Sequence, residues 1–185
     1  MVQRIENARE RFGKAAMELF RTRGYAETTV PQIAAAAGLT ERTFFRYFID
    51  KPEVLFWRAG ELEAEMVHTI SQAVDAKPLD LVIKALEAAG CFFDENRADV
   101  LARQAVVAAH VDFQERELMK MRSLAIATGA ALMERGVAEI AARMAAETGI
   151  VIWRVSIEQW SEGPPSGFSH YVRVCKRELE LIVTC

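Results

Sequence analysis

The chain has 185 residues, 51% of them hydrophobic and 26% charged, which is enough apolar material for a packed core and excludes a disordered chain. Its 10 Gly and 5 Pro are too few for a loop-rich β protein, and 29 Ala against 2 Asn favour helices. The net charge of −3 argues against a protein that binds any nucleic acid through charge alone. Residues 1–58 nevertheless carry +3 and residues 59–185 carry −6, so we expect a polyanionic partner at one end only.

Several classes of protein are disfavoured by what the chain lacks. The longest stretch without a charge is the 13 residues 28–40, which is shorter than the ~18 that a membrane span needs. No apolar signal core precedes the first charges. The three cysteines, Cys91, Cys175 and Cys185, are far apart and form no C-x-x-C pair, so neither a disulfide framework nor a zinc site is indicated. We expect a cytoplasmic protein with no membrane partner, no metal and no cofactor.

The N-terminal region has the pattern of three helices. Apolar residues recur at helical spacing from Ile5 to Leu19, and Gly24 provides a left-handed stop. Thr29 and Gln32 form a capping box for a short helix that Gly38 ends, and Thr40 caps a second short helix from Glu41 through Phe48. Two short helices joined by a tight glycine turn are typical of a helix-turn-helix.

The second short helix has one face suited to DNA. Phe44 and Phe48 are four residues apart and are expected to point inward with Leu39. The opposite face then carries two arginines, a glutamate, a threonine and an aromatic ring. Arginine pairs with guanine, threonine binds phosphate or thymine methyl, and an aromatic edge packs on a methyl or a sugar. The expected outward residues are Glu41, Arg42, Thr43, Phe45 and Arg46.

Residues 5–55 resemble the N-terminal module of the TetR family of one-component regulators. The resemblance is carried by Ala16-Met17-Glu18-Leu19-Phe20, Gly24-Tyr25, Thr28-Thr29-Val30, Ile33-Ala34, Ala37-Gly38-Leu39-Thr40, Thr43 to Phe48 and Lys51-Pro52-Glu53-Val54-Leu55. It implies a three-helix DNA-binding module, a larger helical ligand-binding body, a homodimer, and repression of transcription that a small molecule relieves. The module is expected over residues 1–50 and the body over residues 51–185.

The resemblance also implies roles for single residues. Thr29 and Thr40 would bind phosphate, Glu41, Arg42 and Thr43 would face base edges, and Tyr47 and Lys51 would hold the flanking backbone. Position 45 departs from the family, which usually has a tyrosine there whose hydroxyl reaches phosphate. Glu41 either accepts a hydrogen bond from cytosine or favours the helix N-terminus.

The remaining pattern is helical, giving an all-α chain of about nine helices. A long helix is expected from Asp50 to about Ala76. Further helices are expected over residues 79–94, 98–110 and 113–147, the last kinked or divided at Gly129 or Gly136 and ended by Gly149. Residues 150–161 alternate like a strand, but nothing else could pair with them, so we predict a helix there. A final helix is expected over residues 168–183.

The last two predicted helices each have apolar residues on two faces. A surface helix of a monomer needs only one such face, so the second is predicted to meet a second copy of the chain. A monomer whose body wraps both faces is the alternative. The predicted dimer residues are Val151, Ile152, Val155, Val174 and Leu181.

The effector site is indicated only by large side chains in the body. Its candidates are Trp57, Phe92, Phe93, Arg103, His110, Met119 and Met121, each of which could equally be core. No phosphate-binding loop, H-E-x-x-H or G-x-S-x-G is present, so no catalytic residue is predicted. The predicted partners are an operator in double-stranded DNA, a second copy and an unknown small-molecule effector. The alternative is a helical ligand-binding or architectural DNA-binding protein without operator specificity.

Overall fold

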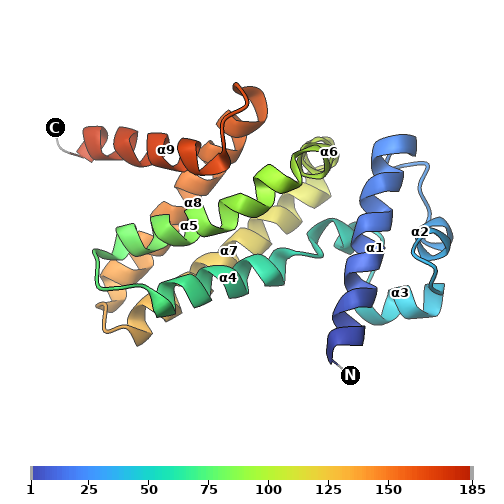
Figure 1. Ribbon diagram of the computed structural model, residues 1–185, viewed down its shortest axis with the longest axis horizontal. Helices are drawn as coiled ribbons and strands as arrows, with labels where there is room; N and C mark the ends of the chain where they lie inside the picture. The colour runs from blue at the N-terminus through green and yellow to red at the C-terminus, as the bar shows by residue number, and fades with distance from the viewer. Residues whose placement is uncertain (1, 184–185) are drawn as a thin grey trace. The chain divides into compact units, whose positions relative to one another are not determined.

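The computed structural model describes the backbone of residues 2–183 and the side chains of residues 8–183. Within that range the chain is entirely helical and has no strand, which confirms the predicted fold class (Figure 1). The helices are α1 (Val2–Arg23), α2 (Val30–Ala36), α3 (Glu41–Tyr47), the 3-10 helix η1 (Pro52–Phe56), α4 (Ala59–Gln72), α5 (Pro78–Glu95), α6 (Arg97–Ala108), α7 (Val111–Glu134), α8 (Glu139–Glu162) and α9 (Phe168–Val183). The predicted contribution of Ile5 to the face of α1 lies outside the described side chains.

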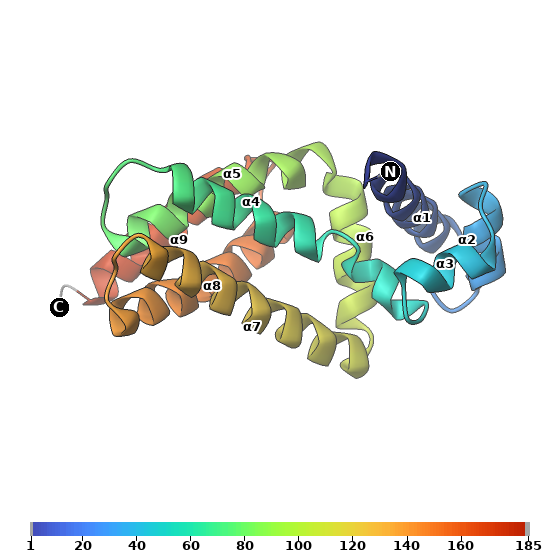
Figure 2. The ribbon, with the colours of Figure 1, turned by 90° about the horizontal axis from the view of Figure 1, so that it is seen from below.

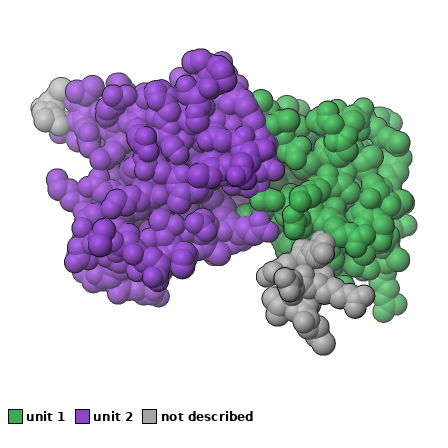
Figure 3. Space-filling view, in the orientation of Figure 1, with its two compact units in different colours: residues 1–59, 98–117 green, residues 60–97, 118–185 purple. Residues whose placement is uncertain are grey.

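The chain forms two compact units, coloured separately in Figure 3. Unit 1 contains residues 1–59 and 98–117, and unit 2 contains residues 60–97 and 118–185. Unit 1 therefore combines α1, α2, α3 and η1 with α6 and the first turns of α7, although about forty residues of sequence separate them.

The core of unit 1 is built around three phenylalanine rings. Phe12 of α1 meets Phe44 edge-on, with ring centroids 5.3 Å apart, and Phe48 at 6.1 Å. All three are buried, as predicted for Phe44 and Phe48, whereas Leu39 is only half-buried. Ile33, Ala34 and Ala37 of α2 belong to the same cluster. The small alanines allow α2 to lie close to its neighbours, and the aromatic packing fixes which face of α3 points outward.

Local hydrogen bonds define both short helices where the sequence predicts them. Thr29 N–H donates to Gln32 Oε1 at 2.9 Å, and Gln32 N–H donates to Thr29 Oγ1, which completes the capping box of α2. Gly38, at φ +62°, makes the left-handed turn after α2. Thr40 Oγ1 then accepts from Thr43 N–H at 3.2 Å and caps α3.

The predicted long helix from Asp50 to Ala76 is wrong, because the structure divides it into η1 and α4. Asp50 does cap the chain there, accepting from Glu53 N–H at 2.9 Å. The carbonyls of Leu55 and Trp57, however, accept hydrogen bonds from Arg103 Nε at 2.8 Å and from Arg9 Nε at 3.0 Å. Arg103 and Arg9 thus form hydrogen bonds with carbonyl groups that would otherwise accept from backbone N–H groups of a continuous helix.

Unit 2 is centred on α5, α8 and α9, which all contact one another. Its densest region is an aromatic cluster in which Phe93 lies 4.9 Å from both Trp153 and Phe168 and 6.3 Å from Trp160, measured between ring centroids. Asp94 Oδ1 accepts hydrogen bonds from Trp160 Nε1 at 3.0 Å and from Phe168 N–H at 2.8 Å. One carboxylate therefore joins α5, α8 and the start of α9.

The helix expected over residues 113–147 is two helices, one of the alternatives that the sequence left open. Figures 1 and 2 show α7 and α8 as an antiparallel pair. The turn is at Gly136, whose φ of +83° favours glycine, and Gly136 N–H donates to Met133 O at 2.8 Å. The predicted helix end at Gly149 is wrong. Gly149 lies inside α8, where a Cβ would collide with Val82 of α5, so the glycine permits close helix packing rather than a stop. The helix predicted over residues 150–161 is confirmed as part of α8.

The described part of the chain has neither a membrane-spanning helix nor a cluster of metal-binding side chains. None of its helices combines the length and the apolar character that crossing a bilayer requires. Nor do three or more His, Cys, Asp or Glu side chains gather there in a way that could hold a metal ion.

Candidate nucleic-acid interface

The outward face of α3 is the candidate contact surface. Phe44 is fully buried, and its neighbour Phe45 is 55% exposed. Glu41, Arg42 and Arg46 are exposed beside it. The helix therefore presents two guanidinium groups, one carboxylate and one aromatic ring on the face that the sequence predicts. Thr43 is half-buried, and its hydroxyl lies 2.9 Å from Thr40 Oγ1.

The remaining predicted phosphate contacts surround this face. Thr29 and Thr40 are exposed, and both hydroxyls cap the helices that follow them. Tyr47 is half-buried, and its hydroxyl accepts a hydrogen bond from Arg46 Nη2 at 3.1 Å. The Arg46 guanidinium also lies 5.0 Å from the centre of the Tyr47 ring, so these two side chains support each other at the surface.

The Lys51 side chain packs against other residues of unit 1, and its amine is hydrogen-bonded there. Its Nζ donates to the carbonyls of Tyr25 at 2.9 Å and Thr28 at 2.8 Å, and it lies 4.0 Å from the centre of the Tyr25 ring. Burial lowers the pKa of this amine below its usual range. Sequence reasoning missed these partners because they depend on how the loop before α2 folds back on the residues that follow α3.

Arg11 of α1 makes a similar contact at the other end of α3. Its Nη2 donates to Ala37 O at 2.5 Å and reaches Gly38 O at 3.4 Å. These carbonyls belong to the turn that joins α2 to α3. Nothing in the amphipathic pattern of α1 singles out Arg11, because its partners are backbone atoms.

The end of α6 and the start of α7 pack against the loop between α1 and α2. The ring of Tyr25 lies 5.0 Å from Phe113 and 5.5 Å from His110. The half-buried Tyr25 has its pKa raised to about 12, first by burial and then by the charge of Asp50. An open depression of about 330 Å³ lies beside it, lined by residues 23–27, Ala105, Val106, Ala109 and His110.

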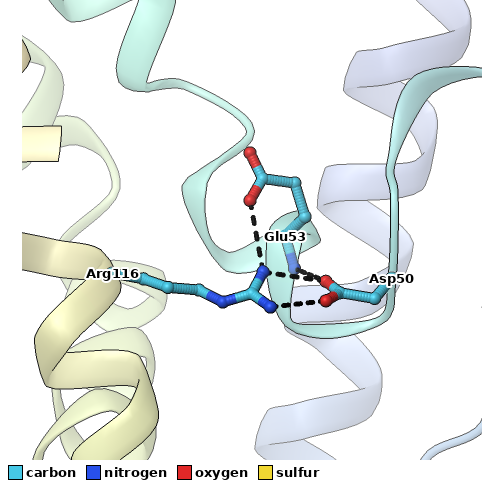
Figure 4. A network of polar contacts seen from close by, with 3 residues as sticks. All are labelled: Asp50, Glu53 and Arg116. Atoms are coloured by element: carbon cyan, nitrogen blue, oxygen red, sulfur yellow. Dashed lines mark hydrogen bonds and ion pairs between the residues drawn. The ribbon is translucent and has the colours of Figure 1, made fainter. Parts of the chain in front are cut away.

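A charged cluster joins α7 to the residues that follow α3. Arg116 donates to both carboxylate oxygens of Asp50, from Nη1 at 3.0 Å and from Nη2 at 2.5 Å, and its Nη1 lies 3.4 Å from Glu53 Oε2 (Figure 4). Arg103 of α6 is likewise paired with Glu117 of α7. Sequence reasoning missed the contacts of Arg116, since Asp50 and Glu53 are more than sixty residues away from it.

The seven predicted effector residues are divided between the two units. Trp57, Arg103 and His110 lie in unit 1, where Trp57 is buried against Gly13 and Arg103 is held by Leu55 O and Glu117. Phe92, Phe93, Met119 and Met121 lie in unit 2. Phe93 is part of its aromatic core, Met119 is exposed, and Phe92 and Met121 are half-buried.

The predicted second apolar face of α8 is present, with one correction. Val151 and Val155 are 56% and 40% exposed, but Ile152 is only 3% exposed and belongs to the core of the protomer. The residues that do share the exposed face with Val151 and Val155, at helical spacing, are Ile140 and Met144. On α9, Leu181 is exposed and Val174 is half-buried.

The N-terminal region of the chain is similar in sequence to known regulators. The family model described as "Bacterial regulatory proteins, tetR family" matches residues 14–56. The HTH-type transcriptional regulator TcmR of Streptomyces glaucescens is 44% identical over 52 residues, which are 28% of this chain and 23% of TcmR. The match thus spans less than a quarter of that relative.

Similarity to solved structures extends over the whole fold. A chain from Syntrophomonas wolfei assigned to the TetR family aligns over 96% of this chain and 95% of its own, with 15% identity and a TM-score of 0.71. FadR of Thermus thermophilus, a TetR-family repressor solved with lauroyl-CoA, aligns over 91% of both chains, with 23% identity and a TM-score of 0.56. Residues 14–56 thus match the TetR family of bacterial regulatory proteins in sequence, and the chain as a whole shares the fold of solved structures assigned to that family.

Proposed function

We propose that the protein is a cytoplasmic, ligand-responsive repressor that binds a pseudo-palindromic operator as a homodimer and is released by a small molecule. One observation carries the DNA-binding part. The face of α3 with Arg42, Phe45 and Arg46 is exposed, while Phe44 holds the opposite face in the core. Exposing a phenylalanine between two arginines is unfavourable in water and favourable in a major groove.

The chemistry of this face assigns a role to each side chain. Arg42, near the N-terminus of α3, reaches a base edge and pairs with guanine, and Glu41 accepts from cytosine. Phe45 packs on a thymine methyl or a sugar. Thr43 faces the base edges beside Arg42. Thr29, Thr40, Arg46 and Tyr47 surround these groups and bind the backbone phosphates, which sets the register.

The homodimer is supported by the exposed stripe of α8. Ile140, Met144, Val151 and Val155 lie on the face opposite the core, and Leu181 adds an apolar side chain from α9. A second copy placed on this stripe would cover it by a two-fold contact between α8 and α9 of each protomer. Such a dimer presents two α3 helices, and half-sites one helical turn apart require them ~34–36 Å from each other.

The effector is proposed to bind unit 2 and to favour a conformation in which the two α3 helices have the wrong spacing. Thr128 Oγ1 and Ser156 Oγ are buried in this unit without a hydrogen-bond partner in the described structure, and a polar ligand would supply one. Of the sequence candidates, Phe92 and Met121 are half-buried and belong to the same unit. Acyl-CoA thioesters are the first compounds to test, because the Thermus neighbour was solved with lauroyl-CoA.

Selection from a random pool of DNA duplexes tests the proposal. Enrichment of a pseudo-palindromic sequence that outlasts random DNA as salt rises is the expected result. Binding without enrichment would favour the alternative, an architectural protein without operator specificity. Absence of any binding would contradict both. With the selected duplex in hand, a transcription assay in which that duplex overlaps the promoter tests repression, and addition of lauroyl-CoA tests release.

A further inference from the structure

Two cations of unit 1 bind backbone carbonyls at the two ends of α3. Arg11 holds the turn before α3 through Ala37 O, and Lys51, three residues after the Phe48 cap, holds Tyr25 O and Thr28 O. Both contacts lead to α1, because Arg11 is on that helix and Tyr25 is the second residue after its end. Hydrogen bonds therefore connect both ends of α3 to α1 or to the residues that directly follow α1.

The contact before α3 fixes a glycine turn. Gly38, at φ +62°, is the residue that reverses the chain between α2 and α3, and Leu39 N–H returns to Ala34 O at 2.9 Å. The last carbonyls of a helix have no partner within it. The Arg11 guanidinium supplies one to Ala37 O and restrains the turn that decides where α3 begins.

The contact after α3 leaves the Lys51 amine little capacity for another ligand. An ammonium has three N–H donors, and two carbonyls lie at hydrogen-bond distance from Nζ. The Tyr25 ring lies against the same nitrogen at 4.0 Å. Only the third N–H is left for another acceptor, so a phosphate that used more than one N–H of Lys51 would have to displace a carbonyl.

We propose that Lys51 and Arg11 are positioning residues that fix the pose of α3 and do not bind DNA phosphate. This rests on the proposed operator binding, and it separates these two cations from those on the outward face. Thr28 is itself held, since its hydroxyl donates to Gly24 O at 2.8 Å, so Lys51 binds a loop that is already restrained. The lowered pKa of Lys51 agrees with an amine withdrawn from solvent.

Salt dependence distinguishes the two roles, with the full chain and the duplex selected as above. Lys51→Met and Arg11→Met should each weaken binding to that duplex at least ~10-fold and leave the slope of log K against log salt unchanged. The control Arg46→Met should lower the magnitude of that slope by about 1 per protomer, as loss of a phosphate contact does. A slope lowered equally by Lys51→Met would overturn the proposal, as would unchanged affinity in both positioning variants.

Amine labelling of the wild-type protein tests Lys51 even if the variants fail to fold. With a small acylating reagent, Lys51 should be modified at least ~10-fold more slowly than the exposed Lys84, both without DNA and with it. If Lys51 is labelled rapidly in the free protein and is protected when DNA is added, Lys51 contacts a DNA phosphate and the proposal is wrong. Labelling without DNA does not depend on an operator, so a failed selection would remove the proposed function while this result still stood.

Discussion

Arg116 on α7 binds Asp50, which accepts from Glu53 N–H at the start of η1, through two hydrogen bonds of 3.0 and 2.5 Å. The pair is two-thirds buried, and Glu53 lies at the same guanidinium. A bidentate arrangement is stronger and more directional than a single ion pair. It connects the residues that follow α3 to the part of α7 that belongs to unit 1.

We predict that Arg116→Met lowers the free energy of unfolding by about 1 kcal/mol, because it leaves two carboxylates side by side without their cation. Denaturant unfolding measures this. The matched control is Arg21→Met, which breaks an exposed pair with Glu18 on α1 and should have no measurable effect. Equal effects in the two variants would show that the Asp50 pair has no special role.

Arg42→Ala should weaken binding to the selected duplex by ~1–3 kcal/mol and relax preference at one symmetric pair of positions. The reason is that a base contact carries sequence information and a phosphate contact does not. The measurement is a second selection with the variant. If specific and random DNA are weakened alike, Arg42 binds phosphate and the assignment is wrong.

Phe45→Tyr should leave stability unchanged, since the ring is 55% exposed. If the restored hydroxyl reaches phosphate, affinity for the selected duplex should rise by roughly 0.5–1.5 kcal/mol, the net value of one hydrogen bond. Thermal unfolding and DNA titration measure the two effects. A destabilised variant would mean that the ring is packed in solution, and unchanged affinity would mean that the phosphate is out of reach.

The double variant Val155→Asp/Leu181→Asp should dissociate the proposed dimer and abolish operator binding, because it places four carboxylates on the apolar contact. Mass in solution measures this. Val111→Asp is the control, since Val111 is exposed at the start of α7 and belongs to unit 1, whereas the stripe belongs to unit 2. A double variant that stays folded, dimeric and able to bind operator would refute the interface.

Tyr25 should make stability fall at alkaline pH. Burial raises its pKa to about 12 from an ordinary value of 10, so the folded state keeps the phenol proton where the unfolded chain has lost it. The contribution is complete below pH 10 and disappears as pH rises to 12, a loss of about 1–2 kcal/mol after allowance for partial exposure. Tyr25→Phe should flatten this loss and Tyr47→Phe should keep it. An equal slope in wild type and Tyr25→Phe would contradict the assignment.

Local chemistry made the N-terminal module predictable from sequence. The capping box of Thr29 and Gln32, the turn at Gly38 and the inward pair Phe44 and Phe48 are all short-range signals. The body was less predictable where helices touch. Glycine commonly ends a helix, yet Gly149 lies inside α8. Its missing side chain leaves room for Val82 of α5, which is more than sixty residues away.

The same difference explains the interface residues. Exposure of Phe45 followed from the periodicity of one helix, whereas the partners of Lys51 and Arg116 required knowledge of the folded loop between α1 and α2 and of α7. Ile152 was misplaced because it follows the exposed Val151 directly, only about 100° around α8, yet it is buried. A sequence pattern does not show how far the core of the protomer reaches around that helix.

The separation of α3 into a packed face and an exposed face also bears on how its DNA preference can change. Glu41, Arg42 and Phe45 are exposed, and the fold is held by Phe44 and the caps rather than by these three. Substitutions at exposed positions usually alter stability by less than ~0.5 kcal/mol. A gene duplicate could therefore acquire a different operator by single substitutions at these positions, each passing through a folded intermediate, while the rest of the regulator stays as it is.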